Sequence, residues 1–174
     1  NRFSLDPKKK IKELSRGMRM KFALAIALSH HADLIIMDEP TSGLDPIVRS
    51  ELLEILAEYI QDEEKAVFLS THLTTDLDKI ADYITFIHEG QILLSQAKDQ
   101  LLDTYAVVKG AKKDLTPNLK ENLIGIKTSS FGFEGLTSDK NLVKKIAGER
   151  VLVEIPTLEE IMLYTVKGDK SWVA

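Results

Sequence analysis

The chain contains no cysteine and no long uninterrupted hydrophobic run. Without cysteine, a disulfide framework and cysteine-ligated zinc are both excluded, which suits a reducing compartment such as the cytoplasm. The longest apolar stretch, residues 22–28, is far shorter than the ~20 residues that a membrane-spanning helix needs. The sequence therefore predicts no transmembrane segment, and any link to a membrane would have to run through a partner.

The chain also lacks a surplus of positive charge, since its formal net charge is −4. Proteins that contact phosphate backbones usually carry a basic surplus, so we expect no nucleic-acid partner. With 44% hydrophobic and 29% charged residues among 174, the composition is that of a globular protein with one core, or one core and a small appendage.

The start of the chain, NRFSLDPKKK, has no initiator methionine and no charged-then-apolar leader of the secretory kind. We therefore expect Asn1 to follow a cut inside a longer protein.

Residues 1–105 alternate between helical and strand patterns. We expect helices over residues 15–30, from Asp45 to about 61, over 74–81 and near 96–105, and strands over 34–37, 66–70, 83–88 and 91–94. The strands 34–37 and 66–70 have the length and flanks of fully buried strands, and Glu89-Gly90 closes a hairpin between the last two. This order predicts an α/β fold, a parallel sheet flanked by helices.

Beyond Tyr105 the pattern changes. Strands are expected over residues 106–109, 124–134 and 151–155, and helices over 141–147 and 157–166. We interpret residues 106–174 as a small C-terminal α+β domain without a chemical motif, separate from the domain formed by residues 1–105.

The stretch LIIMDEPTSGLD at residues 34–45 drives a hydrophobic strand directly into Asp38 and Glu39. In an open α/β sheet, the carboxyl end of a strand is the ligand-binding edge. Because successive side chains of an extended segment point in opposite directions, one carboxylate could hold a magnesium-bound water while the other takes a proton from an attacking water. The alternative is a strand that ends in a solvated acidic turn.

Three further features could belong to a functional site, although each also has a structural explanation. Ser15 and Gly17, in LSRGM, begin a helix whose free backbone N–H groups suit an anion, or they form an ordinary helix cap. His72, just past the strand 66–70, could donate from a neutral imidazole to a terminal phosphate, or it could be structural. Asp45, at the end of SGLD, is equally well explained as a helix N-cap.

Taken together, in this order and at this spacing, these motifs closely resemble those of the nucleotide-binding subunit of ATP-binding cassette (ABC) transporters. LSRGM stands in the place of the signature motif, LIIMDEP in that of Walker B, SGLD in that of the D-loop, and STH in that of the switch histidine. The resemblance covers roughly residues 1–105. The closing PTLEEIMLY also resembles the C-terminal segment of bacterial subunits that pair with separate ABC-2-type permeases.

The resemblance implies the α/β fold of a P-loop NTPase and a set of residue roles. Asp38 would bind Mg²⁺ through water, Glu39 would act as general base, and His72 would contact the γ-phosphate of ATP. Ser15 and Gly17 would bind the γ-phosphate of ATP held by a second ATPase subunit, identical or different, and Asp45 would communicate across that dimer interface.

The signature departs from the family pattern at two positions. Arg16 and Met18 stand where the family usually has glycine and glutamine. The cap could therefore contact phosphate differently, with Arg16 adding a positive charge to the site.

The 174 residues contain no GxxxxGK[ST] motif, the loop that cradles the β- and γ-phosphates. In the family this Walker A loop lies upstream. We therefore expect the chain to be the C-terminal part of a longer ATPase, inactive by itself, with strand edges and apolar faces exposed where upstream strands would pair.

The function expected from the resemblance is ATP hydrolysis that energises a membrane transporter, most consistent with an exporter. The subunit would be cytoplasmic and peripheral on the inner face of the cell membrane, bound to a transmembrane permease. The alternative is a soluble ABC-type ATPase that acts on ribosomes or DNA, which the acidic charge balance and the transporter-like C-terminal segment disfavour.

Overall fold

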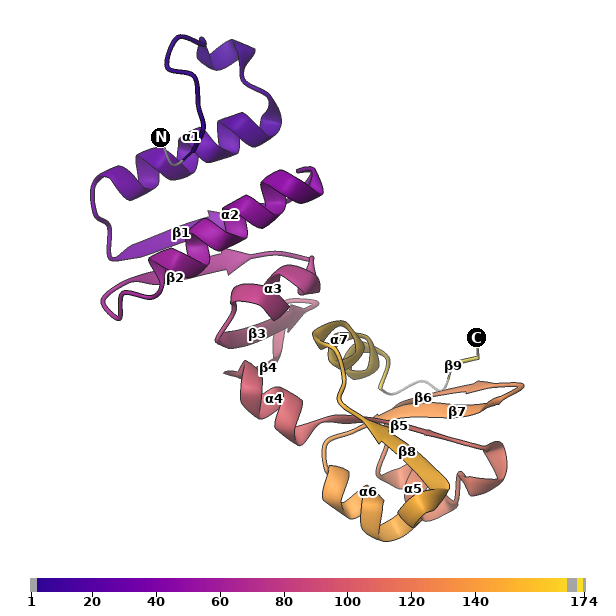
Figure 1. Ribbon diagram of the computed structural model, residues 1–174. Coiled ribbons are helices and arrows are strands. Elements are labelled where there is room, and N and C mark those ends of the chain that lie inside the picture. Colours follow the sequence, from indigo (N-terminus) through magenta and orange to yellow (C-terminus); the bar gives the residue numbers. More distant parts are fainter. Residues whose placement is uncertain (1–2, 169–171, 174) are drawn as a thin grey trace. The chain divides into compact units, whose positions relative to one another are not determined.

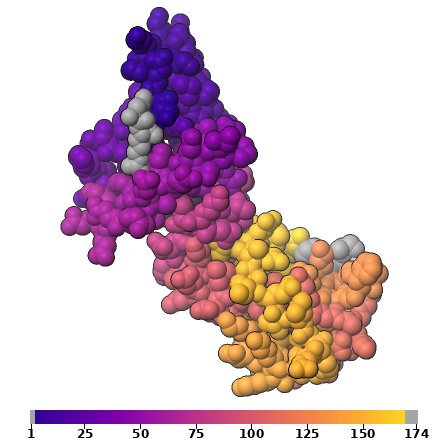
Figure 2. Space-filling view, in the orientation of Figure 1, coloured from indigo at the N-terminus to yellow at the C-terminus, as the bar shows by residue number. Residues whose placement is uncertain are grey.

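A computed structural model of the chain describes residues 3–168 and 172–173. The chain divides into two compact units, residues 1–80 and 81–174. Each unit is built from one continuous stretch of sequence, indigo to magenta for the first and pink to yellow for the second (Figures 1 and 2).

The first unit is a parallel pair of strands with helices packed on one face. Its elements in chain order are the 3₁₀ turn η1 (Ile11–Glu13), α1 (Arg16–Ser29), β1 (Leu34–Asp38), α2 (Pro46–Tyr59), β2 (Ala66–Ser70) and α3 (Thr74–Ile80). The strands β1 and β2 pair in register, from Leu34 opposite Ala66 to Asp38 opposite Ser70. The predicted parallel arrangement of these two strands is confirmed.

The core of the first unit lies between α1, α2 and one face of the strand pair, and α2 runs along the strands (Figure 1). The buried members are contributed by the two helices: Leu24, Leu52, Ile55 and Leu56. Met37 of β1 and Val67 of β2 pack against them from the sheet. Leu52, Ile55 and Leu56 are spaced so that they lie on one face of α2, and this apolar face packs on the sheet.

The opposite face of the strand pair is open. Leu34 is 52% exposed, Ile36 71% and Phe68 65%. The prediction that both strands are fully buried is therefore wrong for this chain, because alternate side chains of each strand point to an uncovered face. The expectation that the chain exposes an apolar sheet face is confirmed.

The second unit begins with an antiparallel hairpin and a short helix. β3 (Tyr83–His88) pairs with β4 (Gln91–Ala97), and α4 (Lys98–Thr104) follows. Glu89 and Gly90 both have positive φ, at 49° and 78°, which is the geometry of a tight two-residue hairpin turn. The predicted hairpin is confirmed, with β4 longer than expected.

A five-stranded sheet forms the rest of the second unit, in the order β8-β5-β7-β6-β9. Its elements are β5 (Ala106–Gly110), η2 (Lys112–Asp114), α5 (Pro117–Glu121), β6 (Ile124–Ser129), β7 (Gly132–Thr137), α6 (Lys140–Ala147), η3 (Gly148–Arg150), β8 (Val151–Glu154), α7 (Leu158–Lys167) and β9 (Trp172–Val173). All its pairings are antiparallel except that of β6 with β9. The C-terminal α+β character is confirmed.

Helices cover both faces of this sheet (Figure 1). On one face, Leu119 of α5 and Val143 of α6 pack with Val108 and Phe133 of the sheet. On the other face, α7 contacts β6 and β7, and the Tyr164 hydroxyl donates to Glu134 Oε1 at 2.5 Å. Burial, reinforced by this hydrogen bond, raises the pKa of the Tyr164 phenol.

Two predictions about the C-terminal half need correction or remain open. The single strand expected over residues 124–134 is two strands, β6 and β7, joined by a turn at Ser130-Phe131. The division between compact units falls after Ile80. The domain boundary expected after Tyr105 lies inside the second unit and stays a prediction about the intact protein.

Candidate functional site

The two parallel strands end side by side in polar residues. Asp38, the last residue of β1, lies opposite Ser70, the last residue of β2. The Ser70 hydroxyl donates a hydrogen bond to Asp38 Oδ1. Because Asp38 shares the open face of the sheet with Ile36, its carboxylate is exposed and accessible to a ligand.

Glu39 leaves the strand in an unusual backbone conformation. Its φ is +46°, in the left-handed region that non-glycine residues rarely occupy, at a cost of about 1–3 kcal/mol. Its backbone N–H donates to the Ser70 carbonyl at 2.9 Å, which ties the turn to the end of β2. The strained turn therefore aims the Glu39 side chain at the segment that follows β2.

That segment carries His72, which contacts Glu39 twice. Glu39 Oε1 lies 2.7 Å from His72 Nδ1 and accepts the His72 backbone N–H at 3.0 Å. The Thr71 hydroxyl lies 3.5 Å from Glu39 Oε2. Both side chains remain open to solvent, since Glu39 is 36% exposed and His72 67%. The structure therefore joins Glu39 and His72 into one acid–imidazole pair beside Asp38.

Asp45 caps the helix that follows. Its Oδ1 accepts the backbone N–H groups of Ile47 and Val48, each at 3.1 Å, and Pro46 occupies the first helical position. This confirms the helix-cap interpretation of Asp45. A role across a subunit interface stays a prediction.

Ser15 and Gly17 also have structural roles. The Ser15 hydroxyl accepts the Met18 N–H at 3.3 Å and caps α1. A Cβ placed on Gly17 would lie 2.9 Å from Val48 Cγ1, so the absence of a side chain there lets α1 approach α2. Both residues lie at a helix N-terminus, which suits an anion, but phosphate binding stays a prediction for them.

Arg16 lies against the SGLD turn of its own chain. A Cβ on Gly43 would lie 2.5 Å from Arg16 Nη1 and 2.8 Å from Cζ, which shows that the guanidinium covers the Gly43 backbone. Gly43 has φ +66°, a conformation that glycine adopts without steric cost. The positive charge is thus at the turn that leads to Asp45, and a phosphate contact for Arg16 stays a prediction.

A buried network, which sequence patterns did not indicate, supports these turns. The carboxylate of Asp76 in α3 is 1% exposed and accepts hydrogen bonds from Thr41 Oγ1 at 2.5 Å and from Arg49 Nε at 2.6 Å. Arg49 Nη2 also donates to Thr75 Oγ1 at 2.5 Å. Asp76 looks like an ordinary solvated residue in sequence, and only the tertiary contacts reveal its burial.

The predicted magnesium ligand fits a cation that arrives with a phosphate ligand. Among the described residues, no three His, Asp or Glu side chains gather closely enough to hold a metal ion by themselves. Mg²⁺ usually keeps several waters and binds one or two carboxylates together with substrate phosphates, so Asp38 with the neighbouring Ser70 hydroxyl is a sufficient protein contribution.

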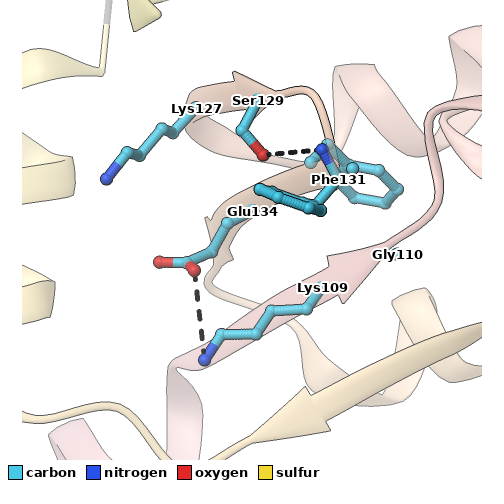
Figure 3. Close-up of a pocket in the computed structure, with 8 residues that line it drawn as sticks. Lys109, Gly110, Lys127, Ser129, Phe131 and Glu134 are labelled. Atoms are coloured by element: carbon cyan, nitrogen blue, oxygen red, sulfur yellow. Dashed lines mark hydrogen bonds and ion pairs between the residues drawn. The ribbon is translucent and has the colours of Figure 1, made fainter. Parts of the chain in front are cut away.

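A surface hollow of about 510 Å³ lies elsewhere, in the second unit, over β5, β6 and β7. Figure 3 shows Lys109 reaching toward Glu134 across it, with Phe131 at its edge. Lys109 Nζ lies 2.6 Å from Glu154 Oε2, and this hydrogen bond raises the pKa of Lys109. The hollow contains none of the predicted site residues and its charges are already matched, so we assign it no ligand.

The chain is similar to one family model and to several transport ATP-binding proteins. The profile of a family described as an AAA domain, putative AbiEii toxin of a type IV toxin–antitoxin system, matches residues 8–75. The lantibiotic transport ATP-binding protein SrtF of Streptococcus pyogenes is 40% identical over 92 residues, which are 53% of this chain and 40% of that protein. The bacitracin transport ATP-binding protein BcrA of Bacillus licheniformis is 34% identical over 88 residues, 51% of this chain and 29% of that protein.

One relative covers the second unit as well. The ABC transporter ATP-binding protein YtrB of Bacillus subtilis is 24% identical over 179 residues, spanning 99% of this chain and 61% of that protein. These matches confirm the resemblance to ATP-binding subunits of ABC transporters. The chain spans less than two thirds of the length of each of these relatives, from 29% to 61%.

Among solved structures, a dimeric post-hydrolysis state of the ATP-binding cassette MJ0796 bound to ADP and Pi matches with a TM-score of 0.50. The two chains are 22% identical, over 55% of this chain and 42% of that one. At this identity the likeness bears on the fold, and it confirms the predicted ABC ATPase type of α/β fold. Within the described residues, no helix combines the length and apolarity needed to cross a membrane.

Proposed function

We propose that the intact protein containing this chain is an ATPase subunit that binds and hydrolyses ATP to energise a membrane transporter, in particular an exporter. The observation that carries this proposal is the Glu39–His72 pair, held at 2.7 Å beside Asp38 at the carboxyl ends of β1 and β2. A carboxylate, a base and an imidazole at the ligand-binding edge of a parallel sheet are suited to phosphoryl transfer to water.

Glu39 is the proposed general base. Its Oε1 already accepts two hydrogen bonds from His72, whereas Oε2 has the longer contact with Thr71 at 3.5 Å. Oε2 is therefore the oxygen we assign to accept the proton of the attacking water. The contacts at Oε1 hold the carboxylate in place while it does so.

His72 is the proposed contact to the γ-phosphate. Its Nδ1 lies 2.7 Å from Glu39 Oε1, which leaves Nε2 as the ring nitrogen that would face the phosphate.

Asp38 and Ser70 are the residues we propose to hold Mg²⁺, through water, when ATP is bound. The ion would neutralise charge that develops on the phosphate oxygens.

Ser15, Arg16 and Gly17 are proposed to contact the γ-phosphate of ATP held by a second ATPase subunit. Asp45, beside the Gly43 turn that Arg16 covers, is proposed to communicate between the two subunits.

The partners follow from this proposal. A transmembrane permease would attach the subunit to the cytoplasmic face of the cell membrane. The proposal is supported by relatives that are named as transport ATP-binding proteins. Membrane fractionation tests this: the intact protein should co-sediment with membranes when its permease is present and stay in the supernatant when the permease is deleted. Ribosome or DNA co-sedimentation in both strains would favour the non-transport alternative.

The decisive experiment substitutes Glu39→Gln in the intact protein. We expect ATP turnover to fall roughly 10²–10⁴-fold, the usual range for loss of a general base, while ATP affinity is kept. Glu63→Gln, at an exposed loop position of the same unit, is the matched control and should turn over at the wild-type rate. Wild-type turnover by the Glu39 variant would refute the role assigned to it.

The 174-residue chain by itself is proposed to be inactive, because it carries no GxxxxGK[ST] loop to cradle the phosphates. A phosphate-release assay on the purified chain should give no signal above that of its own Glu39→Gln variant. A clear difference between the two would contradict the proposed inactivity.

A further inference from the structure

We propose that Asp76 is a positioning residue that keeps the side chains of Glu39 and His72 at the distance and orientation needed for catalysis. This inference rests on the proposed ATPase function, and it assigns a role to a residue outside the recognised motifs. The observation behind it is that one buried carboxylate joins the turn after Glu39, the first turn of α2 and the helix after His72.

The contacts of Asp76 close a ring. Thr41, which donates to Asp76 Oδ2, lies two residues beyond Glu39. His72 lies four residues before Asp76, and the Asp76 N–H donates to the carbonyl of the intervening Leu73 at 2.9 Å. The Glu39–His72 contact completes the circuit. The Asp76 carboxylate thus determines the separation between the Glu39 and His72 side chains.

The ring is needed because the catalytic pair has little support of its own. The pair is substantially exposed to solvent, and exposed ion pairs hold their geometry weakly. Asp76 and Thr41 are 1% and 2% exposed, so their hydrogen bond lies where water does not compete with it. The buried half of the ring can therefore orient the exposed half.

The charge of Asp76 is balanced by Arg49. A buried carboxylate persists only where it is paired and hydrogen-bonded, and each oxygen of Asp76 has one such partner. The Arg49 backbone N–H donates to the Asp45 carbonyl at 3.0 Å, so the same arginine belongs to the helix start that Asp45 caps. The Asp76–Arg49 contact thereby also holds the start of α2 in place relative to the Glu39–His72 pair.

The experiment compares two threonines of the network in the intact ATPase. Thr41→Val removes the hydroxyl that donates to Asp76 and opens the ring while keeping the side-chain shape. Thr75→Val is the matched control, because it removes a contact to Arg49 and leaves the ring closed. Thr41→Ser restores the hydroxyl and should rescue the defect. Because no charge is removed, these variants are expected to fold even if Asp76→Asn does not.

Two readouts are needed. For Thr41→Val we expect kcat to fall about tenfold with KM within about twofold, since the loss is one buried hydrogen bond that orients catalytic groups. The exchange rate of the His72 backbone N–H, which donates to Glu39, should rise by about the same factor. Thr75→Val and Thr41→Ser should match the wild type in both measurements.

The proposal is overturned if Thr41→Val and Thr75→Val behave alike, or if kcat falls while His72 exchange stays unchanged. The exchange measurement requires no ATP turnover. Failure of the positioning role proposed for Asp76 is therefore distinguishable from failure of the proposed ATPase function, which the Glu39→Gln experiment tests separately.

Discussion

The parallel strand pair of the first unit and the five-stranded sheet of the second bury their side chains differently. In β1 and β2 one face packs on α2, while Ile36 and Phe68 on the other face are 71% and 65% exposed. In β5, at the interior of the larger sheet, Val107 and Val108 point to opposite faces and are 1% and 0% exposed. One sheet is covered on a single face and the other on both.

The sheet with the open face is the one that carries the candidate chemistry. Parallel sheets are normally covered on both faces and continued by further strands, so β1 and β2 look like part of a larger layer. The five-stranded sheet has helices on both faces and carries no recognised motif. The half of the chain that carries the candidate site leaves one sheet face uncovered, whereas the C-terminal sheet has helices on both faces.

Oligomeric state should show the largest effect of this difference. We expect the isolated 174-residue chain to self-associate through the open face of β1 and β2, because a contiguous exposed apolar face favours association. Phe68→Ser should lower the weight-average mass measured by light scattering. Phe131→Ser, at a 95% exposed tip of the β6–β7 hairpin, is the control and should leave it unchanged. A clean wild-type monomer at high concentration would contradict the expectation.

Core substitutions should show the next largest effect. Leu56→Ala in the first unit and Leu119→Ala in the second remove side chains that are 0% exposed, and each should cost about 2–5 kcal/mol of unfolding free energy. Ile36→Ala, at the open face, should cost far less. Denaturant unfolding of the three variants measures this, and an equal cost for Ile36 and Leu56 would mean that the open face is covered in solution.

Two glycines allow a smaller and sharper comparison. Gly43 and Gly90 have φ +66° and +78°, so an alanine at either position pays about 1–2 kcal/mol of backbone strain. At Gly43 the new Cβ also meets the Arg16 guanidinium, whereas at Gly90 it meets nothing within 4 Å. Gly43→Ala should therefore lower the Tm more than Gly90→Ala does.

The same comparison has an internal check. In an Arg16→Ala background, the Tm drop caused by Gly43→Ala should shrink to that of Gly90→Ala, because only the strain remains. An unchanged drop would show that Arg16 does not lie on the turn in solution.

The smallest effect concerns an exposed ion pair at the start of the strand pair. Lys65 Nζ lies 2.7 Å from Asp33 Oδ1, and this hydrogen bond holds the pKa of Asp33 below its usual value. Because the pKa of Asp33 is lower in the folded state than in the unfolded state, the ion pair stabilises the fold at pH values above the unfolded-state pKa. This stabilisation is lost as the pH falls through the folded-state pKa. Asp33→Asn should thus slightly lower the Tm at neutral pH and leave it unchanged in strong acid. A Tm difference that persists in acid would contradict this.

Much of the local structure could be predicted because its causes are local. Ser15 and Asp45-Pro46 begin α1 and α2 as expected, since capping and proline geometry act within one turn. The missed helix α5 had the same kind of signal, a Thr116 N-cap followed by Pro117. The prediction that β1 is fully buried was wrong because an aliphatic run predicts a strand but does not determine how many faces of that strand are covered.

The candidate site divides along the same line. The identity and order of Asp38, Glu39, Asp45 and His72 were determined by the sequence, because motif residues and their spacing are written in the chain. Only the tertiary structure brought Glu39 and His72 within 2.7 Å of each other and buried Asp76 beneath them. Contacts between segments some thirty residues apart depend on how β1 pairs with β2 and how α2 packs against α3, and no local pattern encodes that geometry.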